Sequence, residues 1–335
     1  GLVSSDLTWE KASTFNIGLD FTMLNQRLDF SFDWYQRTTS DMLVKVEYPE
    51  VLGTTAPPAN KAELRTRGWE VSVKWNDRIG NDFSYDLGFI LSDSQAEITK
   101  YENPSGTLSD YYVGQKIGEI WGYETEGFYQ SDTDVQNHAD QSKLGANWAP
   151  GDIMYKDLDG NKKINNGSNT LDDHGDLKVI GNTTPRYQYG ITANMSYKNV
   201  YLNVFFQGIG KRDFWPSSQP FWPVATQYYN TQKWFVTDSW SEDNRDAYFA
   251  RPIARETKNQ QKQTKYLQDA SYCRLKNLTV GYDFPKSWLS FLHVAKAGVY
   301  FSAENLFEFT NVKGAYDPEA AGKNGTMVYP FQRTY

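Results

Sequence analysis

Residues 187–206 read YQYGITANMSYKNVYLNVFF, and two alternating runs within this stretch decide the fold class. Apolar or aromatic side chains recur at every second position over 187–197 and again over 200–206, and only Lys198 and Asn199 separate the two runs. Because successive side chains of a β-strand point to opposite faces of its sheet, each run predicts a one-sided strand. The short separation predicts that the two strands form an antiparallel hairpin.

Six further segments alternate in the same way. They cover residues 14–21, 28–34, 69–75, 83–91, 278–282 and 295–301. The eight segments are 5–11 residues long, and the longer ones approach the length that a strand needs to cross a bilayer at a tilt. The chain is therefore predicted to be all-β.

The connections between these segments alternate strictly between short and long. The long connections lie near residues 38–63, 93–184, 208–271 and 303–328. In an antiparallel meander this puts every short turn at one rim and every long loop at the other, which is the organisation of a transmembrane antiparallel β-barrel. A soluble β-sandwich is the alternative, because sandwich strands alternate equally well.

Composition argues against several classes of protein. The 335 residues include 34 Lys+Arg and 41 Asp+Glu, a formal net charge of -7, whereas a nucleic-acid binder usually has a basic face. The mean hydropathy is -0.67 and no run of eighteen apolar residues occurs, so no transmembrane helix is expected. The single cysteine, Cys273, excludes an internal disulfide framework. No nucleophile with a partner histidine at a recognisable spacing is present, and we do not expect an enzyme.

Aromatic residues are unusually frequent, with 11 Trp, 23 Tyr and 19 Phe. Rings with one polar tip suit the two interfaces between a membrane and water, so two girdles are expected. One would lie at the long-loop ends of the strands (Trp34, Tyr35, Trp69, Tyr187 and Tyr272), and the other at the short-turn ends (Trp75, Phe83, Tyr85, Tyr197, Tyr201, Tyr282 and Phe284).

The alternation also assigns two faces to the predicted barrel wall. The face toward lipid would carry Phe15, Ile17, Phe30, Val71, Leu87, Ile191, Leu202, Val280 and Val299. The face toward a wet lumen would carry Asn16, Asp20, Asp29, Asp33, Glu70, Thr192, Asn194, Asn203, Asn277 and Thr279.

Aromatic residues in the long connections are the candidates for substrate contact, because flat rings stack on sugar rings and a polar tip adds a hydrogen bond. They are Trp121 and Tyr123 in the second long connection, and Trp215, Phe221, Trp222, Tyr228 and Tyr229 in the third. The alternative interpretation is that these rings pack the loops. A short amphipathic helix is expected in the third long connection, because aromatic residues recur there near helical spacing at Tyr228, Tyr229, Trp234, Phe235 and Trp240.

One segment resembles a calcium-binding loop. Asp157, Asp159 and Asn161 offer oxygen ligands at alternate positions, as a hard cation requires. Lys162 replaces the usual glycine at the sixth position and Ser168 the usual glutamate at the twelfth, so an Asx-rich surface turn is the alternative. No cofactor is required, and Ca²⁺ is the one metal that the sequence suggests.

Ten strings in order resemble the SusC/RagA-like TonB-dependent outer-membrane transporters. They are LTWEKASTFNIGLDF, NQRLDFSFDWYQRTTSDML, RTRGWEVSVKW, GDIMYKDLDGNKKI, IGNTTPRYQYGI, DSWSEDNRDAYFARP, SYCRLKNLTVGYDFP, VYFSAENLFEFT, GAYDPE and YPFQRTY, and they extend over about residues 7–335. The resemblance implies the C-terminal portion of a 22-stranded plugged barrel, with about eight complete strands plus the start of a ninth. It also implies that the plug domain and the TonB box belong to sequence not seen here.

What the resemblance implies about function is import across the outer membrane of a Gram-negative bacterium. The expected partners are a SusD-like surface lipoprotein, the TonB complex acting through the plug region, and outer-membrane lipid. The expected cargo is an oligosaccharide, or a peptide as in the RagA branch. A soluble carbohydrate-binding β module is the alternative from a different class.

Overall fold

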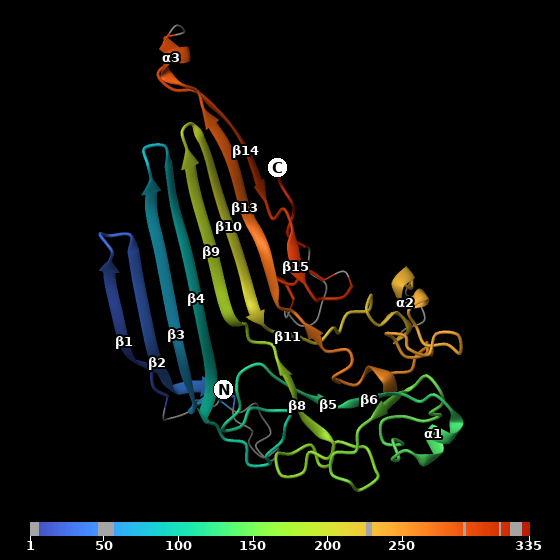
Figure 1. The fold of residues 1–335 in the computed structure, drawn as a ribbon. Coiled ribbons are helices and arrows are strands. Elements are labelled where there is room, and N and C mark those ends of the chain that lie inside the picture. Colours follow the sequence, from blue (N-terminus) through green and yellow to red (C-terminus); the bar gives the residue numbers. More distant parts are fainter. Residues whose placement is uncertain (1–6, 46–56, 226–229, 291–292, 315, 322–329) are drawn as a thin grey trace.

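The fold is described from a computed structural model over residues 7–45, 57–225, 230–290, 293–314, 316–321 and 330–335. Its largest part is one antiparallel sheet with the strand order β1-β2-β3-β4-β9-β10-β13-β14 (Figure 1). The bounds are β1 (Lys11–Met23), β2 (Leu28–Val44), β3 (Ala59–Ile79), β4 (Phe83–Lys100), β9 (Arg186–Tyr197), β10 (Val200–Lys211), β13 (Tyr272–Asp283) and β14 (Gly298–Glu304). The predicted all-β class and the eight antiparallel strands are confirmed.

A short strand, β15 (Glu308–Thr310), pairs with β13 beyond the end of β14. Further along the chain, the amide of Thr334 donates to the carbonyl of Glu304, and the Glu304 amide donates back. This single bridge lies where the start of another strand was predicted.

The strands reach further into the long connections than their alternation indicates. β2 continues to Val44 and β3 begins at Ala59, so paired strand replaces much of the predicted connection 38–63. β4 likewise runs to Lys100, and β10 ends at Lys211. The predicted boundaries were wrong here because the added residues, such as Thr38–Ser40, are polar on both faces. Hydrophobic alternation stops there while backbone pairing continues.

The hairpin turns β1–β2, β3–β4, β9–β10 and β13–β14 all lie at one rim of the sheet, and the long connections lie at the other (Figure 1). The rim of short turns is called the turn rim, and the opposite one the loop rim.

The register aligns like side chains across the sheet, because residues directly opposite each other in paired strands share a face. One row runs through Met23, Leu28, Trp75, Leu87, Ala193, Val204, Leu278 and Ala303. The row beside it, on the other face, contains Asn76, Asp86, Asn194, Asn203, Thr279 and Ser302. These two faces are called the apolar face and the polar face. Every residue predicted to face lipid falls on the apolar face, and every residue predicted to face the lumen falls on the polar face.

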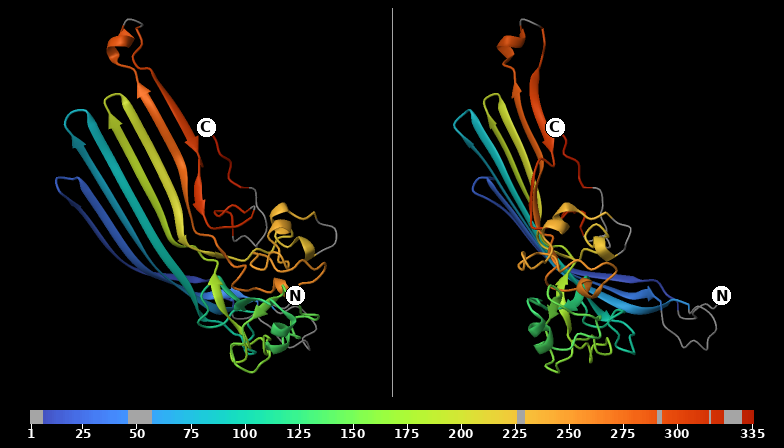
Figure 2. Two further views of the ribbon diagram at one scale, coloured as in Figure 1. Left: turned by 45° about the vertical axis from the view of Figure 1, so that its right-hand side comes forward. Right: turned by 90° about the vertical axis from the view of Figure 1, so that its right-hand side faces the viewer.

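Within the described part of the chain, no second layer covers the apolar face. Phe15 is 60% exposed, Ile17 58% and Val299 58%, and the view along the edge shows a single sheet (Figure 2). In the described residues the other sheets have two strands each and belong to the loops. A soluble monomer rarely exposes so broad an apolar surface. The β-sandwich alternative, which needs these columns buried between two sheets, is contradicted.

The girdle residues divide between the faces. Trp34 and Trp69 stand directly opposite each other on the apolar face, part-way along β2 and β3. Tyr35, Tyr201 and Tyr272 instead lie on the polar face, which corrects their predicted girdle position. The rings of Tyr35 and Tyr201 each cover a glycine of the neighbouring strand, Gly68 under Tyr35 and Gly281 under Tyr201, where a Cβ would meet the ring at 2.5 Å and 2.1 Å.

The described residues of 101–185 and 212–271 fold together beyond the loop rim, and this part is called the loop body (Figure 1). It contains β5 (Glu119–Tyr123), β6 (Thr125–Phe128), α1 (Asp132–Asn137), β7 (Ile153–Tyr155), β8 (Leu177–Asn182), β11 (Asp213–Phe214), α2 (Lys233–Thr237) and β12 (Gln268–Asp269). The predicted short helix is α2, although Trp240 lies beyond its end. At the turn rim a further helix, α3 (Lys286–Leu289), follows β13. Among the described residues, no helix is long and apolar enough to cross a membrane.

Candidate functional site

The polar face forms the first candidate site, a wall of hydrogen-bonding side chains along the inner surface of the sheet. A hollow of about 500 Å³ lies near the turn rim, and Asn76, Asp86, Asn194 and Asn203 contribute to its lining. A second hollow of about 460 Å³ is lined by residues that include Asp20, Asp29, Ser72 and Lys74. Amides, hydroxyls and carboxylates of this kind bind hydrated or hydroxylated solutes.

Acidic side chains outnumber basic ones in the central rows of the polar face. Asp33 and Glu70 stand directly opposite each other on β2 and β3, an arrangement of like charges that destabilises a sheet. Lys74 forms an ion pair with Asp86 at 3.2 Å. On β1–β4 these rows carry Asp20, Asp29, Asp33, Glu70 and Asp86 and the one cation Lys74. This part of the wall is therefore electrostatically negative.

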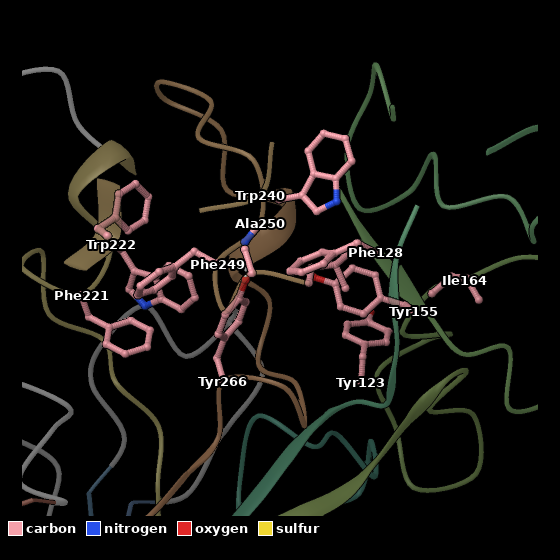
Figure 3. Close-up of a cluster of buried hydrophobic side chains, with 13 residues drawn as sticks. Tyr123, Phe128, Tyr155, Ile164, Phe221, Trp222, Trp240, Phe249, Ala250 and Tyr266 are labelled. Atoms are coloured by element: carbon pink, nitrogen blue, oxygen red, sulfur yellow. Dashed lines mark hydrogen bonds between the residues drawn. The ribbon is translucent and has the colours of Figure 1, made fainter. Parts of the chain in front are cut away.

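The loop body is held by a cluster of aromatic side chains drawn from two long connections (Figure 3). This aromatic cluster consists of Tyr123, Phe128, Ile153, Tyr155, Ile164, Phe221, Trp222, Phe235, Trp240, Ala247, Phe249, Ala250 and Tyr266. The Trp222 and Tyr266 rings meet edge to face at 5.0 Å, and the Tyr266 hydroxyl accepts a hydrogen bond of 2.7 Å from the Ala250 amide. Each such ring pair adds about 0.5–1.5 kcal/mol beyond the burial of its area.

Three of the predicted substrate contacts belong to this cluster. Tyr123 is 4% exposed, Phe221 2% and Trp222 7%. Burial raises the pKa of Tyr123 to about 12. The cavity beside Trp222 is about 20 Å³, room for about one water molecule and not for a sugar ring. The structure gives these three rings a packing role, and their contact with a substrate stays a prediction.

The remaining predicted contacts are placed differently. Trp215 is half-buried at the margin of the aromatic cluster, with its ring 5.9 Å from that of Trp222. Trp121 lies on β5, where its Nε1 donates to the Tyr112 hydroxyl at 3.1 Å. Tyr228 and Tyr229 lie outside the described residues. The structure thus leaves Trp215 and Trp121 as the predicted aromatic residues with accessible surface.

A buried charge network, missed at the sequence level, joins the two long connections. Asp152 accepts two hydrogen bonds of 2.8 Å from Arg251, and it lies 3.0 Å from the ammonium of Lys258. Lys258 also donates to the carbonyls of Ala146 and Asn147 at 2.8 Å. Burial by itself would raise the pKa of Asp152, but hydrogen bonds from Arg251, Asn259 and Lys258 outweigh it and hold that pKa below its usual value. The available signal was the position of Asp152 inside the string GDIMYKDLDGNKKI.

A second network fixes the chain after β15 against the polar face. Arg274 of β13 is fully buried and pairs with Glu308 at 2.9 Å, Asp317 at 2.9 Å and Glu319 at 2.7 Å. The ring of Phe331 lies over its guanidinium at 5.2 Å. These contacts explain why charged residues recur inside the strings SYCRLKNLTVGYDFP and GAYDPE.

The Asp-rich loop brings the two predicted carboxylates, Asp157 and Asp159, together with a third. Oxygen atoms of Asp157, Asp159 and Asp176 lie within 4.8 Å of one another. Asp176, which the spacing did not indicate, is buried and accepts from the amides of Leu158 at 2.7 Å and Asn165 at 2.8 Å. The Asn161 side chain instead accepts from the Lys163 amide, as in an Asx turn.

Comparison with known proteins adds a family. The sequence model described as TonB dependent receptor-like, beta-barrel matches residues 2–306. TonB-dependent receptor P3 of Formosa agariphila is 30% identical over 96% of this chain and 32% of its own length. TonB-dependent receptor SusC of Bacteroides thetaiotaomicron is 27% identical over 98% of this chain and 31% of its own length.

Solved structures agree with the sequence comparison. The RagAB peptide importer in its closed-closed state aligns with a TM-score of 0.71 and 25% identity, over 98% of this chain and 35% of that one. The chain thus spans about a third of the length of the relatives it matches.

Proposed function

The chain belongs to the TonB-dependent receptor-like β-barrel family, and on that premise we propose that it forms part of the barrel wall of an outer-membrane importer. The proposed activity is energised uptake of a bulky nutrient through the lumen, without chemistry on the cargo. The proposed location is the outer membrane of a Gram-negative bacterium.

One observation carries this proposal: the sheet has one exposed apolar face and one polar face that continue across eight strands. From Tyr187 to Tyr197 the apolar face spans eleven residues of β9, with an apolar or aromatic side chain at every second position. At about 3.4 Å per residue and a tilt of roughly 40°, this corresponds to about 25 Å of membrane thickness, the height of the apolar band of a transmembrane barrel.

An oligosaccharide is the proposed cargo. The polar face offers amide, hydroxyl and carboxylate groups, which match the hydroxyl groups of a glycan. Trp215, half-buried at the edge of the aromatic cluster, offers a ring on which a sugar can stack.

A peptide is the second candidate, and one finding favours it. The RagAB importer, whose name states peptide as its cargo, is 25% identical over nearly the whole of this chain. The negative central rows of the polar face would suit a peptide with basic side chains better than an acidic one.

The proposed partners are a SusD-like surface lipoprotein at the loop rim and the TonB complex on the periplasmic side. The loop body supports the first of these, because it is a large folded platform on the rim where a surface partner would dock (Figure 1).

The proposal is tested by purifying the protein from native outer membranes in mild detergent. We expect a surface lipoprotein to co-purify, a bound oligosaccharide to be detected by mass spectrometry, and oligosaccharide uptake to cease when the proton-motive force is dissipated. Bound peptides would support the second candidate instead. A protein that stays monodisperse in plain buffer without detergent would contradict the membrane barrel.

We also propose that the Asp-rich loop binds Ca²⁺ through Asp157 and Asp159. The closeness of the Asp176 carboxylate supports this proposal, and the missing twelfth-position glutamate places the expected affinity in the weak range of about 10⁻⁴–10⁻³ M. Isothermal titration with CaCl₂ should show binding in the parent and none in Asp159→Ala. Equal heats from the two proteins would contradict it.

A further inference from the structure

Outside the apolar face, toward the loop rim, the next two rows carry arginine. Trp69 lies opposite Trp34, and two residues further out Arg67 lies opposite Gln36. Two residues beyond that, Arg65 lies opposite Thr38. At about 3.4 Å per residue, the two arginines therefore stand roughly 7 Å and 14 Å beyond the tryptophan pair, on the same face.

The charges on this part of the face do not cancel. Arg65 pairs with Glu97 at 3.3 Å, and its Nε is buried without a partner among the described residues. Arg67 is exposed, and its Nε donates to the neutral amide oxygen of Gln36 at 2.8 Å. Asp93, which lies opposite Trp69, is paired with Arg186 through two hydrogen bonds. A net positive charge thus remains at Arg67.

The height of these arginines decides what they face. Tryptophan rings mark the boundary between hydrocarbon and headgroups, so side chains just beyond Trp34 and Trp69 lie at headgroup level. The guanidinium of an arginine binds phosphate through two parallel hydrogen bonds. The loop rim is the outer side in the proposed orientation, and the outer leaflet there is made of a glycolipid that carries phosphate.

From this juxtaposition we infer that Arg65 and Arg67 form a binding surface for the phosphate groups of the outer-leaflet glycolipid. The inference rests on the proposed function, because it needs the apolar face to lie in a membrane. The lipid's acyl chains would cover the apolar rows at Val71 and Phe32, and its phosphate would meet Arg67 directly above the Trp34–Trp69 pair.

The test is the amount of phosphorylated glycolipid that co-purifies with the full-length protein from native outer membranes, measured by mass spectrometry. Arg37 supplies the matched control, since it lies at the same level opposite Thr66 but on the polar face. We expect retention to fall about five-fold for each of Arg65→Gln and Arg67→Gln, and to stay unchanged in Arg37→Gln.

Unchanged retention in both lipid-face variants, or an equal loss in Arg37→Gln, would overturn the inference. Membrane assembly is scored separately for every protein, together with Val73→Lys, which lies four residues inside the Trp34–Trp69 pair. If Val73→Lys assembles as well as the parent, the membrane barrel itself is wrong. If the variants assemble in the membrane as the barrel predicts but Arg65→Gln and Arg67→Gln retain as much glycolipid as the parent, only this inference is wrong.

Discussion

Asp152 and Lys258 come from different long connections, and their side chains form an ion pair of 3.0 Å at which both are buried. An ion pair removed from water depends on complete hydrogen bonding, and here Arg251, Asn259 and two backbone carbonyls supply it. This buried ion pair therefore holds the two long connections of the loop body together, in addition to the aromatic cluster beside it.

Removing the charge of Asp152 should loosen the loop body. Asp152→Asn leaves Lys258 buried without its counter-ion, so we expect a loss of about 3–5 kcal/mol in the stability of this part. Urea titration followed by tryptophan fluorescence measures it, because Trp148 and Trp240 pack in the same region. Asp172→Asn, an exposed carboxylate in the same connection, is the control and should be neutral.

The same carboxylate predicts a pH dependence. The pKa of Asp152 is held below its usual value of about 3.9, so its contribution is fully present above that pH and is lost as the pH falls through the lower folded-state pKa. We expect the fluorescence midpoint in urea to be flat from neutral pH to about pH 4 and to drop below it. A drop that is already complete at pH 5 would show that another group controls the loop body.

The two faces of the sheet predict opposite tolerance to charge. Val73→Lys puts a cation on the apolar face, four residues inside the Trp69 boundary, and should cost about 2–4 kcal/mol, whereas Ser72→Lys, on the polar face, should cost much less. Both are compared by the yield of folded protein in an outer-membrane fraction. If Ser72→Lys is the more damaging, the two faces are assigned the wrong way round.

The close approach of the Trp240 ring to Gly151 predicts a fourth effect, on the stability of the loop body. Gly151 has a φ of +87° and a Cβ there would meet the Trp240 ring at 2.3 Å. We expect Gly151→Ala to destabilise the loop body by more than 1 kcal/mol, roughly the cost of the positive φ alone, because the ring must also move. Gly80→Ala is the matched control, since Gly80 has a φ of +61° with nothing within 4 Å. Equal losses in thermal unfolding would mean that the ring contact is unimportant.

The strands were predictable because one physical rule covers most of their length. A wall with different surroundings on its two faces requires alternation, and alternation is visible in segments such as 187–206. The rule fails where both surroundings are polar. β2 therefore continues unseen through Thr38 to Val44, and Tyr35 could not be assigned to a face from its aromatic character alone.

The loop body was harder to predict because its contacts are between residues distant in sequence. Phe221 and Trp222 look equally suited to stack on a sugar or on Tyr266, and only the fold shows that Tyr266 is the neighbour. Asp176 is the third carboxylate of the cluster in the Asp-rich loop, and it lies outside the alternate-residue spacing that indicated Asp157 and Asp159. Contacts of this kind depend on how the long connections fold back on themselves, and the hydrophobic periodicity of the sequence carries no information about that.

The outer edge of β1 has a practical consequence. Among the described residues no strand pairs with that edge. Along Lys11–Met23, the amide and carbonyl groups that point away from β2 therefore have no partner strand there. The segment has no proline to block addition of a foreign strand, and its Phe15 and Ile17 side chains favour such growth. Expressed by itself, this polypeptide is expected to polymerise edge to edge, and a synthetic peptide that occupies the free ladder should cap the growing ends.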